Sequence, residues 1–116
     1  MTTIEMTGVD PGRVVAALAR RRLAAALGRL TVTPVRARIV FFDDDGPKGG
    51  PAVRCALTIR LPYRPLVRVE EAAGAPRQAF DGAFASLERQ LERYRERQRE
   101  SRRRPKKYYA ARRLTS

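Results

Sequence analysis

The sequence contains no histidine, no tryptophan and a single cysteine, Cys55. Without histidine and with one thiol, the chain has no ligands for a Cys/His zinc cluster, no internal disulfide and no histidine-based catalytic triad. We therefore expect no catalytic residue, no metal site and no cofactor. Cys55 stands in an alternating pattern typical of a strand, where a cysteine usually acts as a small buried hydrophobe.

Long apolar runs are also scarce, because Arg20, Arg21 and Arg22 interrupt the longest of them. The N-terminus lacks a basic leader followed by an apolar stretch, as a signal peptide would have. A membrane-spanning helix needs about 20 apolar residues. The sequence therefore predicts a soluble cytoplasmic protein that makes no contact with a membrane.

Positive charge is what the sequence has in excess. Lys and Arg number 25 against 12 Asp and Glu, which gives a net charge of +13 in 116 residues. A chain this small and this basic is typical of proteins that neutralise phosphate groups, so we expect a nucleic-acid partner rather than a small-molecule substrate. The length suits one domain. We place that domain at residues 1–100 and a flexible basic tail at 101–116, and we expect a monomer when the protein is free.

The N-terminal part predicts a strand followed by a helix. Ile4–Thr7 alternates apolar and polar residues, which favours a short strand. Asp10 and Pro11 are typical of an N-cap and a first helical turn, and Gly28 is typical of a helix end. We therefore expect a helix from Pro11 to about Leu27. Its apolar stripe consists of Val15, Ala19, Leu23, Ala26, Leu27 and Leu30.

The middle of the chain predicts a three-stranded meander. Residues 35–42 and 53–61 alternate apolar and polar side chains on either side of a loop rich in Asp, Gly and Pro at 43–51. Pro62 and Pro65 flank a break, after which residues 66–70 supply another strand. Beyond Gly74 the apolar period changes to 3.6, which predicts a long helix that ends near Pro105.

The predicted order is therefore β-α-β-β-β-α. An α+β fold with a four-stranded sheet and both helices packed on one face is the simplest arrangement for this order. The residues expected to face the helices are Ile4, Met6, Val35, Ala37, Ile39, Phe41, Val53, Cys55, Leu57, Ile59, Leu61, Val67 and Val69. The opposite parity places Arg36, Arg38, Arg54, Arg60 and Arg68 on the uncovered face, offset only by Glu5 and Glu70.

Several stretches together resemble one protein family. They are ALTIRLP at 56–62, LVRVEE at 66–71, Ala79-Phe80-Asp81 and LERQLERYR at 87–95, and Ile4–Gly8 fits the first strand. The sequence resembles the ribosome hibernation promoting factor and ribosome-associated translation inhibitor family, in a short form without a C-terminal dimerisation domain. The resemblance covers about residues 52–100 most clearly and implies a layout like that of double-stranded-RNA-binding domains.

The resemblance implies a non-enzymatic function. Family members occupy the cleft of the small ribosomal subunit within the 70S ribosome, block the path of mRNA and tRNA, and inhibit translation under stress or in stationary phase. The residues we expect to contact rRNA are Arg20, Arg21, Arg22, Arg36, Arg38, Arg54, Arg60, Arg68, Arg89, Arg93, Arg95, Arg102, Arg103, Arg104, Lys106 and Lys107. The helix positions Arg89, Arg93 and Arg95 enter this set because relatives are basic there.

Other interpretations remain open from the sequence. The arginines of the sheet could form an ordinary solvated face, and interleaved glutamates could neutralise Arg89, Arg93 and Arg97. The protein could be an RNA-binding regulator that does not act on ribosomes. It could also be a magnesium-dependent nucleic-acid enzyme that uses Asp43–Asp45 or Glu70 and Glu71, although three adjacent carboxylates in a Gly/Pro loop are usually solvated turn residues.

Overall fold

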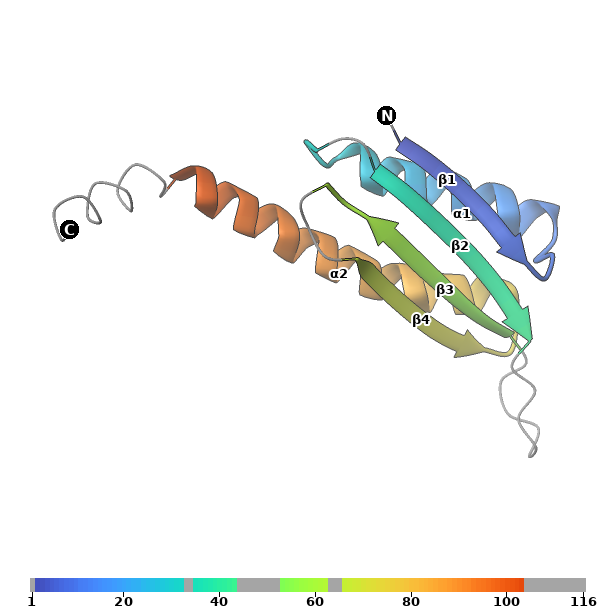
Figure 1. The fold of residues 1–116 in the computed structure, drawn as a ribbon. Helices are drawn as coiled ribbons and strands as arrows, with labels where there is room; N and C mark the ends of the chain where they lie inside the picture. The colour runs from blue at the N-terminus through green and yellow to red at the C-terminus, as the bar shows by residue number, and fades with distance from the viewer. Residues whose placement is uncertain (1, 33–34, 44–52, 63–65, 104–116) are drawn as a thin grey trace, which may run out of the picture.

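The computed structural model describes residues 2–32, 35–43, 53–62 and 66–103. Its elements follow one another as β1 (Thr2–Gly8), α1 (Arg13–Gly28), β2 (Val35–Asp43), β3 (Val53–Arg60), β4 (Val67–Ala73) and α2 (Pro76–Arg103) (Figure 1). The predicted β-α-β-β-β-α order and the α+β class are confirmed.

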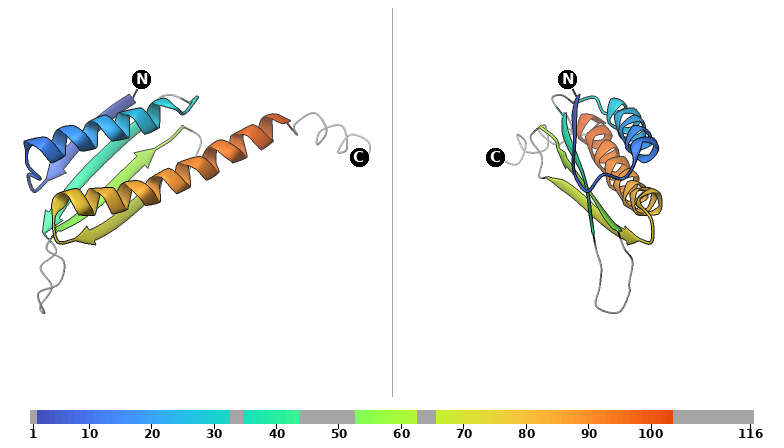
Figure 2. Two further views of the ribbon diagram at one scale, coloured as in Figure 1. Left: turned by 180° about the vertical axis from the view of Figure 1, so that it is seen from behind. Right: turned by 90° about the vertical axis from the view of Figure 1, so that its right-hand side faces the viewer.

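The four strands form one sheet in the order β1-β2-β3-β4. β1 runs parallel to β2, whereas the β2–β3 and β3–β4 pairs are antiparallel. A parallel pair needs a long crossover, and α1 supplies it. Figure 2 shows both helices on the same side of the sheet. Within the described ranges, no helix or strand covers the other side, which we call the open face.

The core lies between the helices and the sheet, and it consists mainly of the residues that the two periodicities predict, with Ala79 in addition. The stripe of α2 is buried throughout, at Phe80, Ala83, Phe84, Leu87, Leu91 and Tyr94. The strands and Leu61 just after β3 contribute Val35, Ala37, Ile39, Phe41, Cys55, Leu57, Ile59, Leu61 and Val69, and the first helix and its C-terminal end contribute Ala19, Leu23, Leu27 and Leu30. Ile4, Met6, Val15, Ala26, Val53 and Val67 pack against this core while partly exposed. Each large apolar side chain that leaves water stabilises the fold by roughly 1.5–3 kcal/mol.

The predicted start of the first helix is wrong, and its end lies one residue beyond the predicted Leu27. Asp10 does not cap it: the Asp10 carboxylate accepts a hydrogen bond from the amide of Gly12 at 2.9 Å, and this local turn delays the helix to Arg13. Gly28 is the last helical residue rather than the residue that stops the helix. The amide of Arg29 instead donates to the carbonyl of Ala26 at 3.3 Å, which tightens the final turn.

The strands also differ in length from the prediction. β1 begins at Thr2, and β4 continues to Ala73 because its pairing with β3 extends to the Val53–Ala73 pair. The long helix ends at Arg103, close to the predicted end. Most of the predicted acidic loop, the centre of the predicted break at Pro62–Pro65 and residues 104–116 lie outside the described residues, so the boundary between domain and tail stays a prediction.

Candidate nucleic-acid interface

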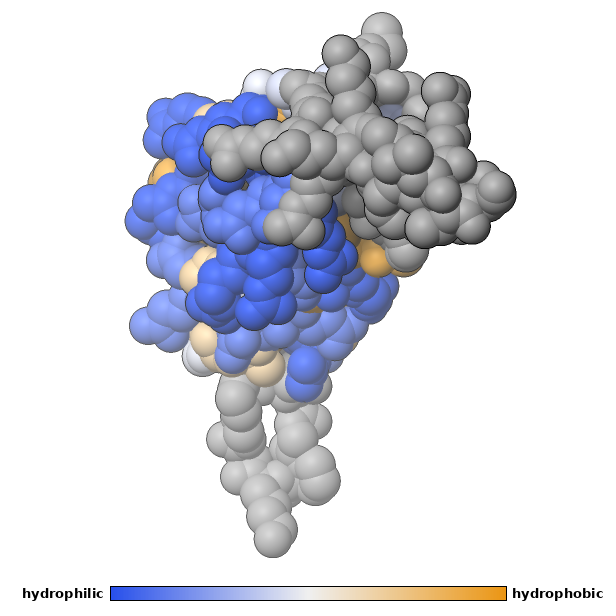
Figure 3. Space-filling model, turned by 90° about the vertical axis from the view of Figure 1, so that its left-hand side faces the viewer, coloured by the Kyte–Doolittle hydropathy of each residue, from blue (hydrophilic) through white to orange (hydrophobic). Residues whose placement is uncertain are grey.

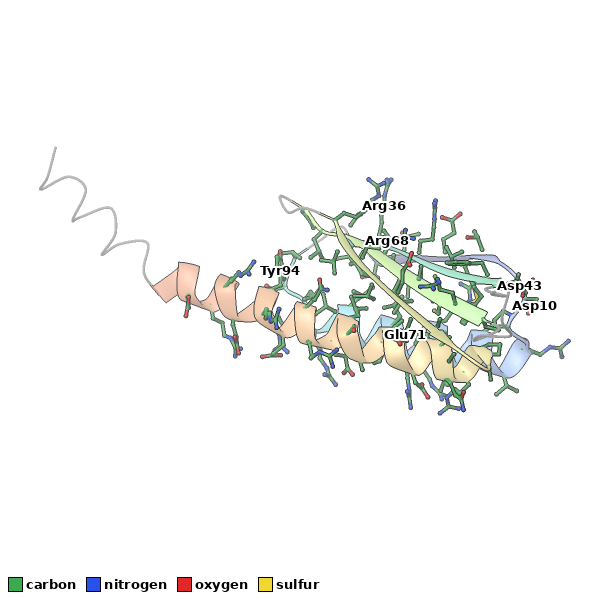
Figure 4. The ribbon with its side chains drawn as sticks, turned by 90° about the horizontal axis from the view of Figure 1, so that it is seen from below. Asp10, Arg36, Asp43, Arg68, Glu71 and Tyr94 are labelled. Carbon is green, nitrogen blue, oxygen red and sulfur yellow. The ribbon has the colours of Figure 1, made fainter. Side chains whose placement is uncertain are left out.

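The open face of the sheet presents a group of arginines, as the alternation predicts. They are Arg36, Arg38, Arg54, Arg60 and Arg68, and each is at least partly exposed. Figure 4 shows Arg36 and Arg68 on the side of the sheet away from α2. Within the described ranges no charged side chain is buried. The cationic groups of this face are therefore accessible to a partner.

Arg36 and Arg60 form the most basic part of this face. They are directly paired across the antiparallel β2–β3 ladder, and the β1 neighbour of Arg36 is the uncharged Thr3. Neither guanidinium has an ion-pair partner among the described residues. Like charges at directly opposed strand positions destabilise a sheet. An anion that binds both guanidinium groups would relieve that repulsion.

The other three arginines of the open face are held by the two predicted glutamates. Arg38 lies 3.2 Å from Glu5 on the neighbouring strand. Glu70 contacts both Arg68 and Arg54, the latter at 3.5 Å. These ion pairs are partly or largely exposed, and such pairs usually contribute less than about 1 kcal/mol. They orient the three side chains and offset their charges. The uncompensated positive charge of the open face is therefore concentrated at Arg36 and Arg60.

The arginines of α1 lie on the helical side of the molecule. Arg22 is 3.2 Å from the carboxylate of Asp81 in α2, and Asp81 also contacts Arg77 at 3.3 Å. Arg20 approaches the carbonyl oxygen of Ile4 at 3.4 Å, and Arg21 is exposed. Asp81 therefore joins the two helices through their charged side chains.

Two adjoining grooves run between α1 and α2 and combine charges of both signs. Arg29 lines both grooves, together with Glu88 and the small residues Ala26 and Ala85. Arg29 is absent from the residues predicted for RNA contact. Its position seven residues after Arg22, two helical turns along the same side of α1, is the signal that could have identified it.

The interpretation that interleaved glutamates neutralise Arg89, Arg93 and Arg97 is not matched by an ion pair among the described residues. Glu92 contacts Arg95 at 3.5 Å and Arg99 at 3.2 Å instead. Arg89 donates to the hydroxyl of Ser86 at 3.1 Å. Arg93 and Arg97 have no ion-pair partner among the described residues, so their charges remain available on one side of α2.

The remaining predicted contact residues belong to the C-terminal end. Arg102 and Arg103 are part of α2, but their side chains are outside the description, as are Arg104, Lys106 and Lys107 altogether. Whether any of the predicted residues touches RNA stays a prediction at this point.

Metal and thiol chemistry receive no support from the described part of the chain. No cluster of three or more His, Cys, Asp or Glu side chains suited to a metal ion occurs there. Burial raises the pKa of the Cys55 thiol to about 12. The thiol therefore stays protonated at neutral pH, in which form it is a poor nucleophile. No helix among the described residues is long and apolar enough to span a membrane.

Comparison with known proteins gives a family match over nearly the whole described chain. The model of the family described as "Sigma 54 modulation protein / S30EA ribosomal protein" matches residues 2–99. A search of curated protein sequences found no significant match.

Solved structures share the fold at low sequence identity. The N-terminal domain of Protein Y from Thermus thermophilus is 23% identical, with a TM-score of 0.60 over 79% of this chain and 94% of that one. A ribosomal subunit interface protein from Coxiella burnetii is 19% identical, with a TM-score of 0.63 over 81% of this chain and 98% of that one.

Proposed function

The chain belongs to the Sigma 54 modulation protein / S30EA ribosomal protein family, and from this membership we propose that it binds the small ribosomal subunit and inhibits translation. This family is the one that the sequence motifs indicate, that of the ribosome hibernation promoting factors. In the proposed mechanism the domain occupies the path of mRNA and tRNA, and arginines hold it there by contacts with rRNA phosphates. The proposal contains no chemical step.

The observation that carries the RNA contact is the Arg36–Arg60 pair. The two cations are directly opposed on an exposed strand pair, and neither has an ion-pair partner among the described residues. Folding alone gains nothing from this arrangement, because like charges at opposed positions repel. The arrangement does favour binding of an RNA phosphate backbone, because each phosphate that the protein neutralises releases counterions.

The names of the similar structures are in line with this function. One is called Protein Y, and the other is described as a ribosomal subunit interface protein. A protein that occupies the subunit interface as a monomer would exclude mRNA and tRNA by volume alone. We further propose that the protein acts in the cytoplasm under stress or in stationary phase, when silencing ribosomes without degrading them is useful.

Co-sedimentation with purified ribosomes and separated subunits tests the proposal. We expect the wild-type protein to sediment with the small subunit and with 70S ribosomes, and to inhibit translation in vitro. Affinity should fall steeply between low and high KCl, because roughly 0.9 counterions are released per neutralised phosphate. Failure to sediment with the small subunit at low salt would refute the proposed function.

A pair of charge-matched variants tests the surface. The double change Arg36→Gln and Arg60→Gln lowers the net charge from +13 to +11, and so does the control Arg13→Gln with Arg99→Gln. We expect the sheet variant to bind at least about tenfold more weakly and to lose about 2 units of the salt slope. The control should bind nearly as the wild type does. Equal losses in both variants would show that the open face is not the docking surface.

A further inference from the structure

A third groove lies where the end of the sheet meets α2, outside the sheet face and the helix–helix grooves. Its sheet side is formed by Leu61 after β3 and by Leu66 and Val67 at the start of β4, and its helix side by Gln90, Arg93, Tyr94 and Arg97. Figure 4 labels Tyr94, a residue of α2 near this end of the sheet. The groove encloses about 250 Å³. Pockets for drug-sized molecules usually measure roughly 300–1,000 Å³, so this groove suits one flat group rather than a larger ligand.

The charges around this groove have one sign. Arg93 and Arg97 lie one helical turn apart on the same side of α2, and no described carboxylate contacts either of them. The acids adjacent in sequence are Glu92 and Glu96, and Glu92 is engaged with Arg95 and Arg99. Both grooves between the helices include Glu88 in their lining, whereas the described residues that line this groove include no carboxylate.

An apolar wall stands beside these cations. Leu66, which directly precedes β4, is 47% exposed, and Tyr94, which is only 7% exposed, lines the same groove. The side-chain amide of Gln90 can both donate and accept hydrogen bonds. Figure 3 shows that the molecule is mostly hydrophilic when viewed from the end at which α2 leaves the sheet. The exposed Leu66 beside Arg93 and Arg97 suits a ligand that is apolar on one side and anionic on the other.

An unpaired nucleotide has that combination. We propose that this groove binds one unstacked nucleotide of a single-stranded RNA, with the base against Leu66 and Tyr94 and the adjoining phosphates at Arg93 and Arg97. Gln90 hydrogen-bonds the edge of the base. A base inside a duplex has no free face to offer, so the groove discriminates single strands from duplexes. The inference deepens the proposed function, because it assigns a second mode of RNA contact that reads an exposed base rather than the phosphate backbone alone.

Leu66→Ser tests the base contact without changing charge. The probe is a fluorescent RNA of mixed sequence, about twelve nucleotides long, within the usual site sizes for single strands, offered as a single strand or as the annealed duplex. Leu66 is 47% exposed, and a base that covers it removes apolar surface from water, so we expect Leu66→Ser to weaken single-strand binding at least about fivefold. Binding of the duplex should not change. The matched control is Val14→Ser, because Val14 is 79% exposed and lies outside the groove.

Arg93→Gln combined with Arg97→Gln tests the phosphate contacts. This variant should weaken binding of the single strand and reduce its salt dependence, whereas the double change Arg95→Gln and Arg99→Gln should do so to a smaller extent. Thermal unfolding of every variant establishes that it is folded, which we expect because Leu66 and both arginines are exposed. A Leu66→Ser variant that binds the single strand as the wild type does, or that loses single strand and duplex equally, overturns the proposal.

The outcome separates this inference from the proposed function. If the wild-type protein sediments with ribosomes but shows no preference for the single strand over the duplex, the nucleotide groove is refuted and the ribosomal function stands. If it binds the single strand through Leu66 but does not sediment with ribosomes, the groove is supported and the ribosomal function is refuted.

Discussion

Gly8 lies directly against the carbonyl group of Phe41, where β1 leaves the sheet. A Cβ atom at Gly8 would lie 2.1 Å from that carbonyl oxygen, and the backbone of Gly8 has φ +90°. The same oxygen accepts a hydrogen bond from the amide of Val9 at 2.7 Å. Only glycine has both the conformational freedom and the lack of volume that this contact requires.

Gly8→Ala should therefore destabilise the fold by at least about 2 kcal/mol, since positive φ costs an alanine about 1–2 kcal/mol and the contact with Phe41 adds to it. Gly28→Ala is the control, because Gly28 lies in α1 with nothing within 4 Å of the added atom. It should be neutral or stabilising by up to about 1 kcal/mol. Urea unfolding measures both, and a Gly8→Ala variant as stable as the wild type would contradict this description of the β1–β2 edge.

The ion pair between Arg22 and Asp81 predicts a small coupling between the helices. Both side chains are more than 40% exposed, at 42% and 44%, so the coupling should be about 0.5 kcal/mol and should fall with added salt. A double-mutant cycle of Arg22→Gln and Asp81→Asn in urea measures it. The pair Arg77 and Asp81 provides the comparison within one helix. A coupling above about 2 kcal/mol would mean that the pair is desolvated, contrary to its exposure.

Cys55 predicts a loss of stability in alkali. Burial raises its pKa from the ordinary 9.0 to about 12 in the folded chain. Between these values the unfolded chain loses the thiol proton and the folded chain retains it, so the contribution to stability is complete below pH 9 and declines as the pH rises toward 12. Near pH 10 the loss is about 1.4 kcal/mol relative to pH 8.

Cys55→Ala isolates this effect from other groups that titrate in alkali. The stability difference between the wild type and the alanine variant should shrink by about 1.4 kcal/mol between pH 8 and pH 10. In the same pH range a thiol reagent should react with the folded wild type only through opening of the core. Rapid reaction at pH 8 under native conditions would show that the thiol is accessible.

Removing residues 104–116 should separate affinity from stability. The segment contains five basic residues and no acidic one, so the net charge falls from +13 to +8. The buried core of the described chain ends at Tyr94, and we expect the midpoint of thermal unfolding to be unchanged. Ribosome affinity and its salt slope should both decrease. A large drop in thermal stability would assign the segment a structural role.

The buried and exposed faces of the strands and helices could be predicted from the sequence, because each periodicity depends only on neighbouring residues. Alternation in residues 35–42 separates Ile39 from Arg38, and the 3.6-residue period separates Phe84 from Glu88, whatever the partner is. The end of α1 was less predictable, because Asp10 can cap a helix or form a local turn with Gly12, and the two choices differ little in energy.

Relations between strands were beyond the reach of the sequence. Parity places Arg36 and Arg60 on one face, but only the register of β2 against β3 makes them direct neighbours. The groove at Leu66 could not be predicted for the same reason, because it forms where the start of β4 lies next to residues 90–97 of α2, which are distant in sequence. On α2, Glu92 stands between two columns of arginines, and the sequence did not indicate that it contacts Arg95 and Arg99 rather than the column of Arg93.

The length of α2 has a consequence for its local stability. The helix continues from Tyr94, its last buried residue, to Arg103, and Figure 1 shows this part extending past the end of the sheet. Among the described side chains of this stretch none is buried, and it is supported by helix propensity and the ion pairs of Glu92. Amide hydrogens up to about Tyr94 should therefore exchange with solvent only when the whole domain unfolds, whereas those nearer Arg103 should exchange by fraying. One continuous helix thus contains a gradient of protection, with its most readily opened turns nearest the basic C-terminal segment.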